Sequence, residues 1–135
     1  MFERLINLAF IPLFLCISIA AEGAKLYPVD TNIIIVGLVK DGVGYDANGK
    51  REEYYYLKLD NPISVSGDDF YPGEKNVTKL ELVPTGNFDL HKFYKKRIRV
   101  TGSFFHAEND HHHTRILLEI DKLSDVTIVK EMKKR

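Results

Sequence analysis

Cysteine is nearly absent from this sequence. The 135 residues include a single cysteine, Cys16, which lies in an apolar N-terminal stretch that we expect to be removed from the mature chain. A disulfide framework is then excluded, so a hydrophobic core must hold the fold, and roughly 115 residues are enough to form one. The bulky Leu15 directly before Cys16 also argues against lipid modification of this cysteine.

An excess of charge of either sign is also missing. Lys and Arg together number 19, as do Asp and Glu, so the formal net charge is zero. Surfaces that bind nucleic acid are usually clearly basic, because they neutralise phosphates. We therefore do not expect nucleic acid among the partners.

The sequence has no apolar run long enough for an ordinary membrane-spanning helix. Leu5–Ala20 is about 16 residues long, whereas a span needs ~20. A short charged start precedes this run and small residues end it, which is the layout of a secretory signal peptide. We predict a signal peptide over residues 1–21, a single mature domain over residues 22–135 without a membrane span, and a periplasmic or secreted location in a bacterium. An uncleaved membrane anchor is the alternative.

The motifs of common catalytic sites are missing as well. No serine lies in a nucleophile elbow, and no glycine-rich loop has the spacing that holds phosphates. We therefore predict that the protein is not an enzyme. A metal-dependent hydrolase is the less favoured alternative, because Glu108 is the only candidate for a general base near the histidines.

Five segments have the alternating or β-branched apolar pattern of β-strands. They are Ile33–Lys40, Glu53–Leu59, Val77–Val83, Arg97–Ala107 and Thr114–Leu123. Gly37 would let the first segment bend sharply, and Asn87 or Asp89 could cap a short helix between the third and fourth. This order of elements predicts an all-β fold with one short helix, a small five-stranded OB-fold-like β-barrel. An SH3-like barrel is the nearest alternative.

The same pattern predicts which segments are loops and which residues form the core. Asp41–Arg51 and Asp60–Asn76 are rich in turn residues and are predicted to be connections. The alternation places ten residues toward the core: Tyr55, Leu57, Leu59, Leu80, Leu82, Ile98, Val100, Phe104, Ile116 and Leu118.

Four of the five histidines lie where the fourth and fifth predicted strands meet. On an extended strand His111 and His113 point the same way, and a tight hairpin could bring His106 across from them. Three neutral imidazoles on one side of a hairpin can hold zinc or copper. His106, His111 and His113 are therefore candidate metal ligands; polar loop residues that cover the end of the barrel, or a pH-sensitive contact surface, are the alternatives.

Aromatic and basic side chains lie on the outward faces of the second and fourth predicted strands. Aromatic rings beside cations suit a sugar, a peptide or a small acidic ligand, although an ordinary solvent-facing sheet has the same composition. The candidate ligand-binding residues are Tyr54, Tyr56, Lys58, Arg97, Arg99, Phe105 and His112.

Three stretches resemble the signature of a known family. Leu59-Asp60-Asn61-Pro62, Gly102–Ala107 and His111–Thr114 are similar to the pattern of a bacterial exported family, domain-of-unknown-function family 4431. The resemblance covers most of the mature chain, and the histidine-rich hairpin is its most specific part. It implies export and a small β-domain, and no known activity. This chain departs from the pattern at Asn109-Asp110, where the family has Thr-Gly.

Together these patterns predict an exported, non-enzymatic OB-fold-like binding domain that contacts a small ligand or an envelope protein through the histidine-rich loop. Two alternatives stay open. One is a periplasmic zinc- or copper-binding protein; the other is a module for protein interaction in the cell envelope, such as an assembly factor or an inhibitor.

Overall fold

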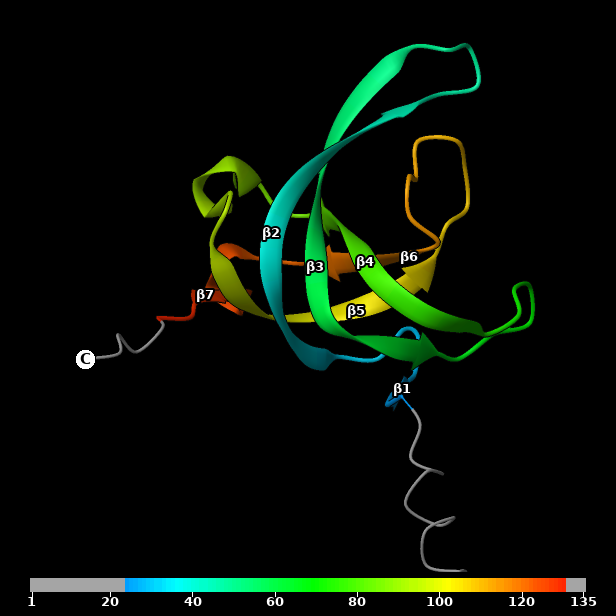
Figure 1. Ribbon diagram of the computed structural model, residues 1–135, viewed down its shortest axis with the longest axis horizontal. Helices are drawn as coiled ribbons and strands as arrows, with labels where there is room; N and C mark the ends of the chain where they lie inside the picture. Colours follow the sequence, from blue (N-terminus) through cyan, green and yellow to red (C-terminus); the bar gives the residue numbers. More distant parts are fainter. Residues whose placement is uncertain (1–23, 131–135) are drawn as a thin grey trace, which may run out of the picture.

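The computed structural model describes residues 24–130, which form seven strands and two short 3-10 helices. The predicted signal peptide and Cys16 lie outside the described residues. The elements are β1 (Leu26–Tyr27), β2 (Ile33–Tyr45), β3 (Arg51–Val65), β4 (Glu74–Pro84), η1 (Leu90–Phe93), β5 (Arg97–His106), β6 (Ile116–Ile120), η2 (Leu123–Asp125) and β7 (Val126–Ile128) (Figure 1).

Five of the strands close into a mixed barrel. β2 pairs with β3 and β5, β3 pairs with β4, and β6 closes the ring between β4 and β5. The β4–β6 pair is parallel, whereas the other four pairs are antiparallel. β1 and β7 are extra strands on β3 and β5. The predicted OB-fold-like five-stranded barrel is confirmed.

The long strand β2 serves two neighbours because it bends near Gly37. Its first half pairs with β5 and its second half with β3, and Leu38 has partners on both. A Cβ at Gly37 would come within 2.7 Å of the Leu57 side chain and of the Lys58 carbonyl oxygen. The bend therefore needs glycine for a close approach between strands.

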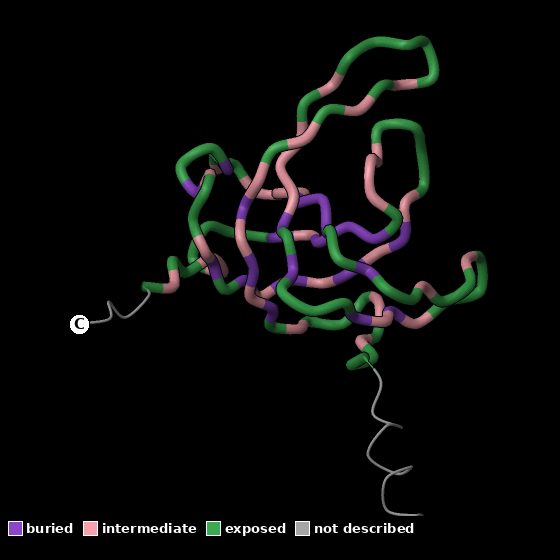
Figure 2. Tube along the Cα trace, in the orientation of Figure 1, coloured by how far each residue is buried: buried purple, intermediate pink, exposed green. Residues whose placement is uncertain are grey.

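The buried residues lie mainly on the strands of the barrel (Figure 2), and their side chains form one hydrophobic core cluster. Nine of the ten predicted core residues are buried, and the tenth, Tyr55, is partly buried and packs against them. Phe104, near the end of β5, is fully buried, and its ring forms an edge-to-face pair with the Tyr27 ring, with 5.5 Å between the centroids.

Two local predictions were wrong. Asp60–Asn76 is not one long loop, because β3 continues to Val65 and β4 begins at Glu74. Ile63 and Val65 are buried, so core packing extends the strand past Pro62, and register shifts on either side of Ile63 accommodate the irregularity. The hairpin after β2 is also longer than predicted, since β2 runs to Tyr45 and β3 begins at Arg51.

The short helix between the third and fourth barrel strands is confirmed as η1, a single 3-10 turn. Asp89 caps it by accepting a hydrogen bond from the His91 amide at 2.9 Å. Leu90 and Phe93 are its buried residues.

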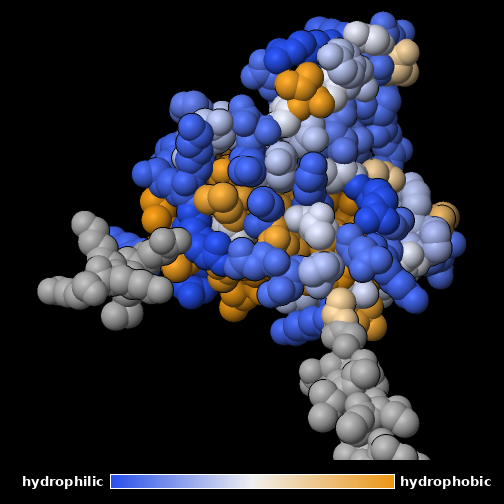
Figure 3. Space-filling model, in the orientation of Figure 1, coloured by the Kyte–Doolittle hydropathy of each residue, from blue (hydrophilic) through white to orange (hydrophobic). Residues whose placement is uncertain are grey.

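Along residues 24–130, no helix is long and apolar enough to cross a membrane. The hairpin between β2 and β3 projects from the barrel and is mainly hydrophilic, while the apolar side chains visible from this side gather over the body of the barrel (Figure 3).

Candidate functional site

Two loops meet at one end of the barrel. The first is the β2–β3 hairpin with its turn at residues 46–50, and the second is the histidine loop, Ala107–Arg115, between β5 and β6. They stand side by side in Figure 1, and the Ala47 amide of the hairpin donates a hydrogen bond to Asp110 Oδ2 of the histidine loop at 2.7 Å. Residues more than 60 positions apart are thus joined directly.

Each loop is shaped by a short polar side chain. In the hairpin, Asp46 Oδ1 accepts hydrogen bonds from the Asn48 and Lys50 amides at 2.9 and 2.8 Å, and Gly49 adopts φ +81°. In the histidine loop, Asn109 Oδ1 accepts from the His111 amide at 2.9 Å. Asx turns of this kind set the direction of the side chains that follow.

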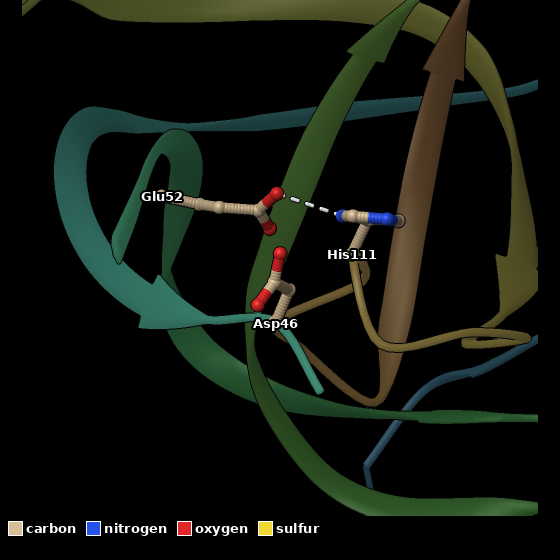
Figure 4. A group of neighbouring side chains, drawn as sticks. All are labelled: Asp46, Glu52 and His111. Carbon is tan, nitrogen blue, oxygen red and sulfur yellow. Dashed lines mark hydrogen bonds and ion pairs between the residues drawn. The ribbon is translucent and has the colours of Figure 1, made fainter. Parts of the chain in front are cut away.

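Glu52, near the start of β3, links the two loops. Its Oε2 lies 2.7 Å from His111 Nδ1, and its Oε1 lies 2.9 Å from His113 Nε2 (Figure 4 shows the first pair). The hydrogen bond to His111 is the main cause that lowers the pKa of Glu52, and the same bond raises the pKa of His111. One carboxylate therefore holds two of the predicted metal ligands.

The ring of His113 is almost enclosed. Its side chain is only 9% exposed, and it stacks on Tyr54 with 5.0 Å between ring centroids. The ring also lies against Gly44, where any Cβ would overlap the imidazole. Gly44 pairs with Glu52 across the hairpin. The glycine therefore leaves space for the His113 ring next to the Glu52 carboxylate, which that ring contacts.

A buried carboxylate, Glu81 of β4, lies under the histidine loop. Glu81 is 9% exposed and accepts a hydrogen bond from the His113 amide at 2.6 Å, while its own amide donates to Thr114 Oγ1 at 2.9 Å. Burial raises the pKa of the Glu81 carboxyl, and burial also raises the pKa of the Tyr54 phenol. The loop is therefore anchored to the barrel through backbone and side-chain bonds.

The other two histidines of this region make different contacts. His106 is 4% exposed, its Nε2 lies 2.9 Å from the Ser66 carbonyl oxygen, and its ring stacks on Tyr71. His112 Nδ1 accepts from the Glu108 amide at 2.9 Å, and its ring meets the edge of Phe105. The structure thus brings His111 and His113 together and gives His106 separate partners.

The predicted ligand-binding residues fall on two sides of the barrel. Tyr54, Tyr56 and Lys58 alternate along the outer face of β3, next to β4; Lys79 of β4 lies opposite Lys58, with its Nζ 5.2 Å from the Tyr56 ring centroid. Arg97 and Arg99 belong to β5, which lies on the other side of β2. Arg97 forms an ion pair with Asp60.

A cavity of about 250 Å³ opens beside the enclosed histidine. It is lined by Tyr54, Val77, Thr78, Lys79, His113, Thr114 and Arg115. Of the predicted residues, Tyr54 and His113 line it. Arg115 also forms an ion pair with Glu74 at 2.6 Å.

Sequence reasoning missed Asp46, Glu52, Lys79 and Glu81. Glu52 lies two residues before Tyr54 and points to the same outer face of β3 as Tyr54 and Tyr56. The predicted strand Glu53–Leu59 began one residue too late to include it. Asp46 and His111 meet only because the hairpin folds beside the histidine loop. Asp46, Glu52 and His111 each offer one ligand atom, and these atoms lie within 4.8 Å of one another (Figure 4).

Comparison with known families shows that the histidine loop lies within a segment that matches a family model. Residues 79–124 match a family model described as a domain of unknown function (DUF4431). The match runs from β4 to η2 and includes Lys79, Glu81 and the whole histidine loop. No curated protein and no solved structure matches the chain.

Proposed function

We propose that this chain, which carries a DUF4431 domain over residues 79–124, is an exported, non-enzymatic binding domain for a small acidic ligand. The ligand lies on the outer face of β3 and β4 and contacts the histidine loop. Among acidic ligands, a saccharide that bears a carboxylate fits best, because Tyr54 and Tyr56 offer rings beside the cations.

The position of this face supports the proposal. In OB-folds, the face of the second and third barrel strands, together with the loop between strands one and two and the loop between strands four and five, binds oligosaccharides and oligonucleotides. Here those strands are β3 and β4, and those loops are the β2–β3 hairpin and the histidine loop. The cavity lies between β3, β4 and the histidine loop.

The observation that carries the choice of an acidic ligand is the pair formed by Lys58 and Lys79. They are directly opposite each other on β3 and β4, and both are exposed. Like charges directly opposite in an antiparallel pair destabilise it. A bound carboxylate near this pair would offset the repulsion, and Lys79 also lines the cavity.

The test is to titrate the protein with galacturonic acid disaccharide, and separately with lactose as the neutral comparison, while amide NMR monitors the signals. We expect the acidic sugar to shift the amides of β3, β4 and the histidine loop, and lactose to shift them far less. Lys79→Ala should weaken binding of the acidic sugar at least tenfold, since it removes a charge-assisted contact.

Lys122→Ala is the matched control, because Lys122 is an exposed cation that follows β6, whereas the histidine loop precedes this strand. It should leave the affinity within twofold of the unsubstituted protein. The proposal fails if the two sugars bind equally, or if Lys122→Ala weakens binding as much as Lys79→Ala.

Export is supported by the charged start, the short apolar run and the small residues of positions 1–21. Expression in a bacterium with an intact N-terminus should deliver the protein to the periplasm. Mass spectrometry should find that the chain begins after Ala20 or Ala21. Recovery of the full-length chain from the membrane fraction would instead indicate an uncleaved anchor.

A further inference from the structure

We propose that Asp46, Glu52 and His111 form a binding site for one divalent transition-metal ion, with zinc as the best match. The ion would join the β2–β3 hairpin to the histidine loop. This site differs from the triad His106, His111 and His113, and none of its three residues lines the cavity of the acidic-ligand face, so it goes beyond the proposed function.

The donor atoms are already close to the positions that a metal ion needs. Zinc binds nitrogen and oxygen ligands at about 2.0–2.2 Å, so two ligands of a tetrahedral ion lie about 3.4 Å apart. Glu52 Oε2 and His111 Nδ1 are 2.7 Å apart, and the three donors lie within 4.8 Å of one another. Side-chain movements of about 1 Å would place all three around one ion.

Glu52 and Asp46 are also held by further hydrogen bonds, and a carboxylate faces the second ring nitrogen of His111. Glu52 Oε1 contacts His113 Nε2 at 2.9 Å, and Asp46 Oδ1 accepts from the Asn48 and Lys50 amides. His111 Nε2 faces Asp110 Oδ1 at 3.9 Å. A carboxylate at the remote nitrogen of a histidine fixes the ring tautomer and orientation in many metal sites.

Charge at this end of the barrel favours a cation. The carboxylates of Asp46, Glu52 and Asp110 lie around the imidazole of His111. Asp110 is held in place by the Ala47 amide of the opposite loop, so the negative charges converge from both loops. A divalent ion would offset their mutual repulsion.

The ligand chemistry separates zinc from the common hard cations. Calcium takes six to eight oxygen ligands, and magnesium prefers oxygen and keeps its waters. One imidazole with two carboxylates is the mixed set that first-row transition ions such as zinc accept, with a water in the fourth position. A response to zinc without a response to calcium is therefore the expected signature.

Calorimetric titration with zinc chloride and with calcium chloride tests the site, with the chain purified from the periplasm of an expression host. We expect one zinc ion per chain and no heat of binding for calcium at the same concentrations. His111→Ala and Glu52→Gln should each weaken zinc binding more than tenfold. The His111 side chain is 59% exposed, so its removal should leave the fold intact, which amide NMR would check.

His112→Ala is the matched control, because it removes the next imidazole of the same loop, whose ring lies against Phe105. It should leave zinc affinity within twofold. A second readout is the visible spectrum of the cobalt-substituted protein, which should change on Asp46→Asn. The site is refuted if zinc fails to bind at one ion per chain, or if His112→Ala weakens binding as much as His111→Ala.

The outcomes for the two proposals can be read separately. His111→Ala should weaken zinc binding more than tenfold and leave the Lys79-dependent difference in affinity between acidic and neutral sugars. Lys79→Ala should reduce that difference and leave zinc binding unchanged. If both variants change both measurements equally, the two sites are not distinct and the metal proposal is wrong.

Discussion

At the scale of single residues, the histidine loop depends on contacts that lie beneath it. Glu81 is a carboxylate with little access to water, and its partner is the backbone amide of His113. His113 in turn fits only because residue 44 has no side chain. The position of the loop is thus sensitive to changes that do not alter any residue of the proposed metal site.

The Glu81 carboxyl should make stability depend on pH in an unusual direction. Because burial raises its folded pKa above the ordinary 4.5, the folded state binds this proton more tightly than the unfolded chain. Its contribution to stability is present below the unfolded pKa and is lost as pH rises through the folded pKa. Thermal unfolding between pH 4 and pH 8 should show Glu81→Gln gaining stability relative to the unsubstituted protein as pH rises.

Asn109→Ala serves as the comparison, because it alters the histidine loop without removing a titratable group. Its stability difference from the unsubstituted protein should stay nearly constant with pH. A constant difference for Glu81→Gln as well would show that burial does not perturb this carboxyl.

Gly44→Ala should displace the His113 ring, because the new methyl group overlaps the imidazole. We expect a loss of about 1–3 kcal/mol in the free energy of unfolding, the usual cost of overpacking. Urea unfolding measures the loss, and NMR should show that the His113 side-chain signals move. Val43→Ala, at an exposed neighbouring position, should cost less than half as much; equal costs would contradict the proposed steric origin.

At the scale of elements, β2 determines the shape of the site. Its bend at Gly37 lets one strand pair with β5 and then with β3, and its second half carries the hairpin out beside the histidine loop. The turn at Asp46 and the enclosed ring at Gly44 both lie on this second half. The bend in β2 and the position of the site are therefore linked.

Gly37→Ala should weaken the pairing of β2 with β3 at the bend of β2. The added Cβ would lie 2.7 Å from both the Leu57 side chain and the Lys58 carbonyl oxygen, so β2 and β3 must separate locally. We expect a loss of about 1–3 kcal/mol in urea unfolding and faster amide hydrogen exchange in β3 around Leu57. Ile34→Ala, at a site that is 60% exposed on the same strand, should leave exchange in β3 unchanged. Unchanged exchange in Gly37→Ala would rule out the local separation.

At the scale of the whole molecule, barrel closure rests on non-local pairs. The parallel β4–β6 ladder joins residues about 36 positions apart, and β5 pairs with β2, β6 and β7. The described residues include no cysteine, so packing and hydrogen bonding hold this arrangement. Loss of a central core side chain should therefore affect the entire barrel.

Phe104→Ala should destabilise the whole barrel cooperatively. Phe104 is fully buried on β5, and truncation of a buried phenylalanine costs about 3–5 kcal/mol. Thermal unfolding followed by tyrosine fluorescence and by far-ultraviolet circular dichroism should give the same lowered midpoint. Phe70→Ala is the control, because that ring is 86% exposed and its loss should leave the midpoint nearly unchanged. Separate midpoints for the two signals would contradict a single cooperative core.

The element order and most of the core could be predicted from the sequence. Alternation fixes which side of a strand is buried, since neighbouring side chains point to opposite faces. Leu57, Leu80, Ile98 and Phe104 follow that rule and are fully buried. The short helix could also be predicted locally, because the side chain of Asp89 caps the residues that directly follow it in the chain.

Only the tertiary structure decided which side chains meet at the site. Glu52 contacts His111 and His113 across 59 and 61 positions, and Asp110 contacts Ala47 across 63. Spacing within the loop predicted that His111 and His113 act together, yet His106 has its partners in the β3–β4 loop, at Ser66 and Tyr71. Local periodicity determines the face of a strand, and Gly37 was a local signal for the bend of β2. The meeting of the two loops also depends on barrel closure, which no local pattern encodes.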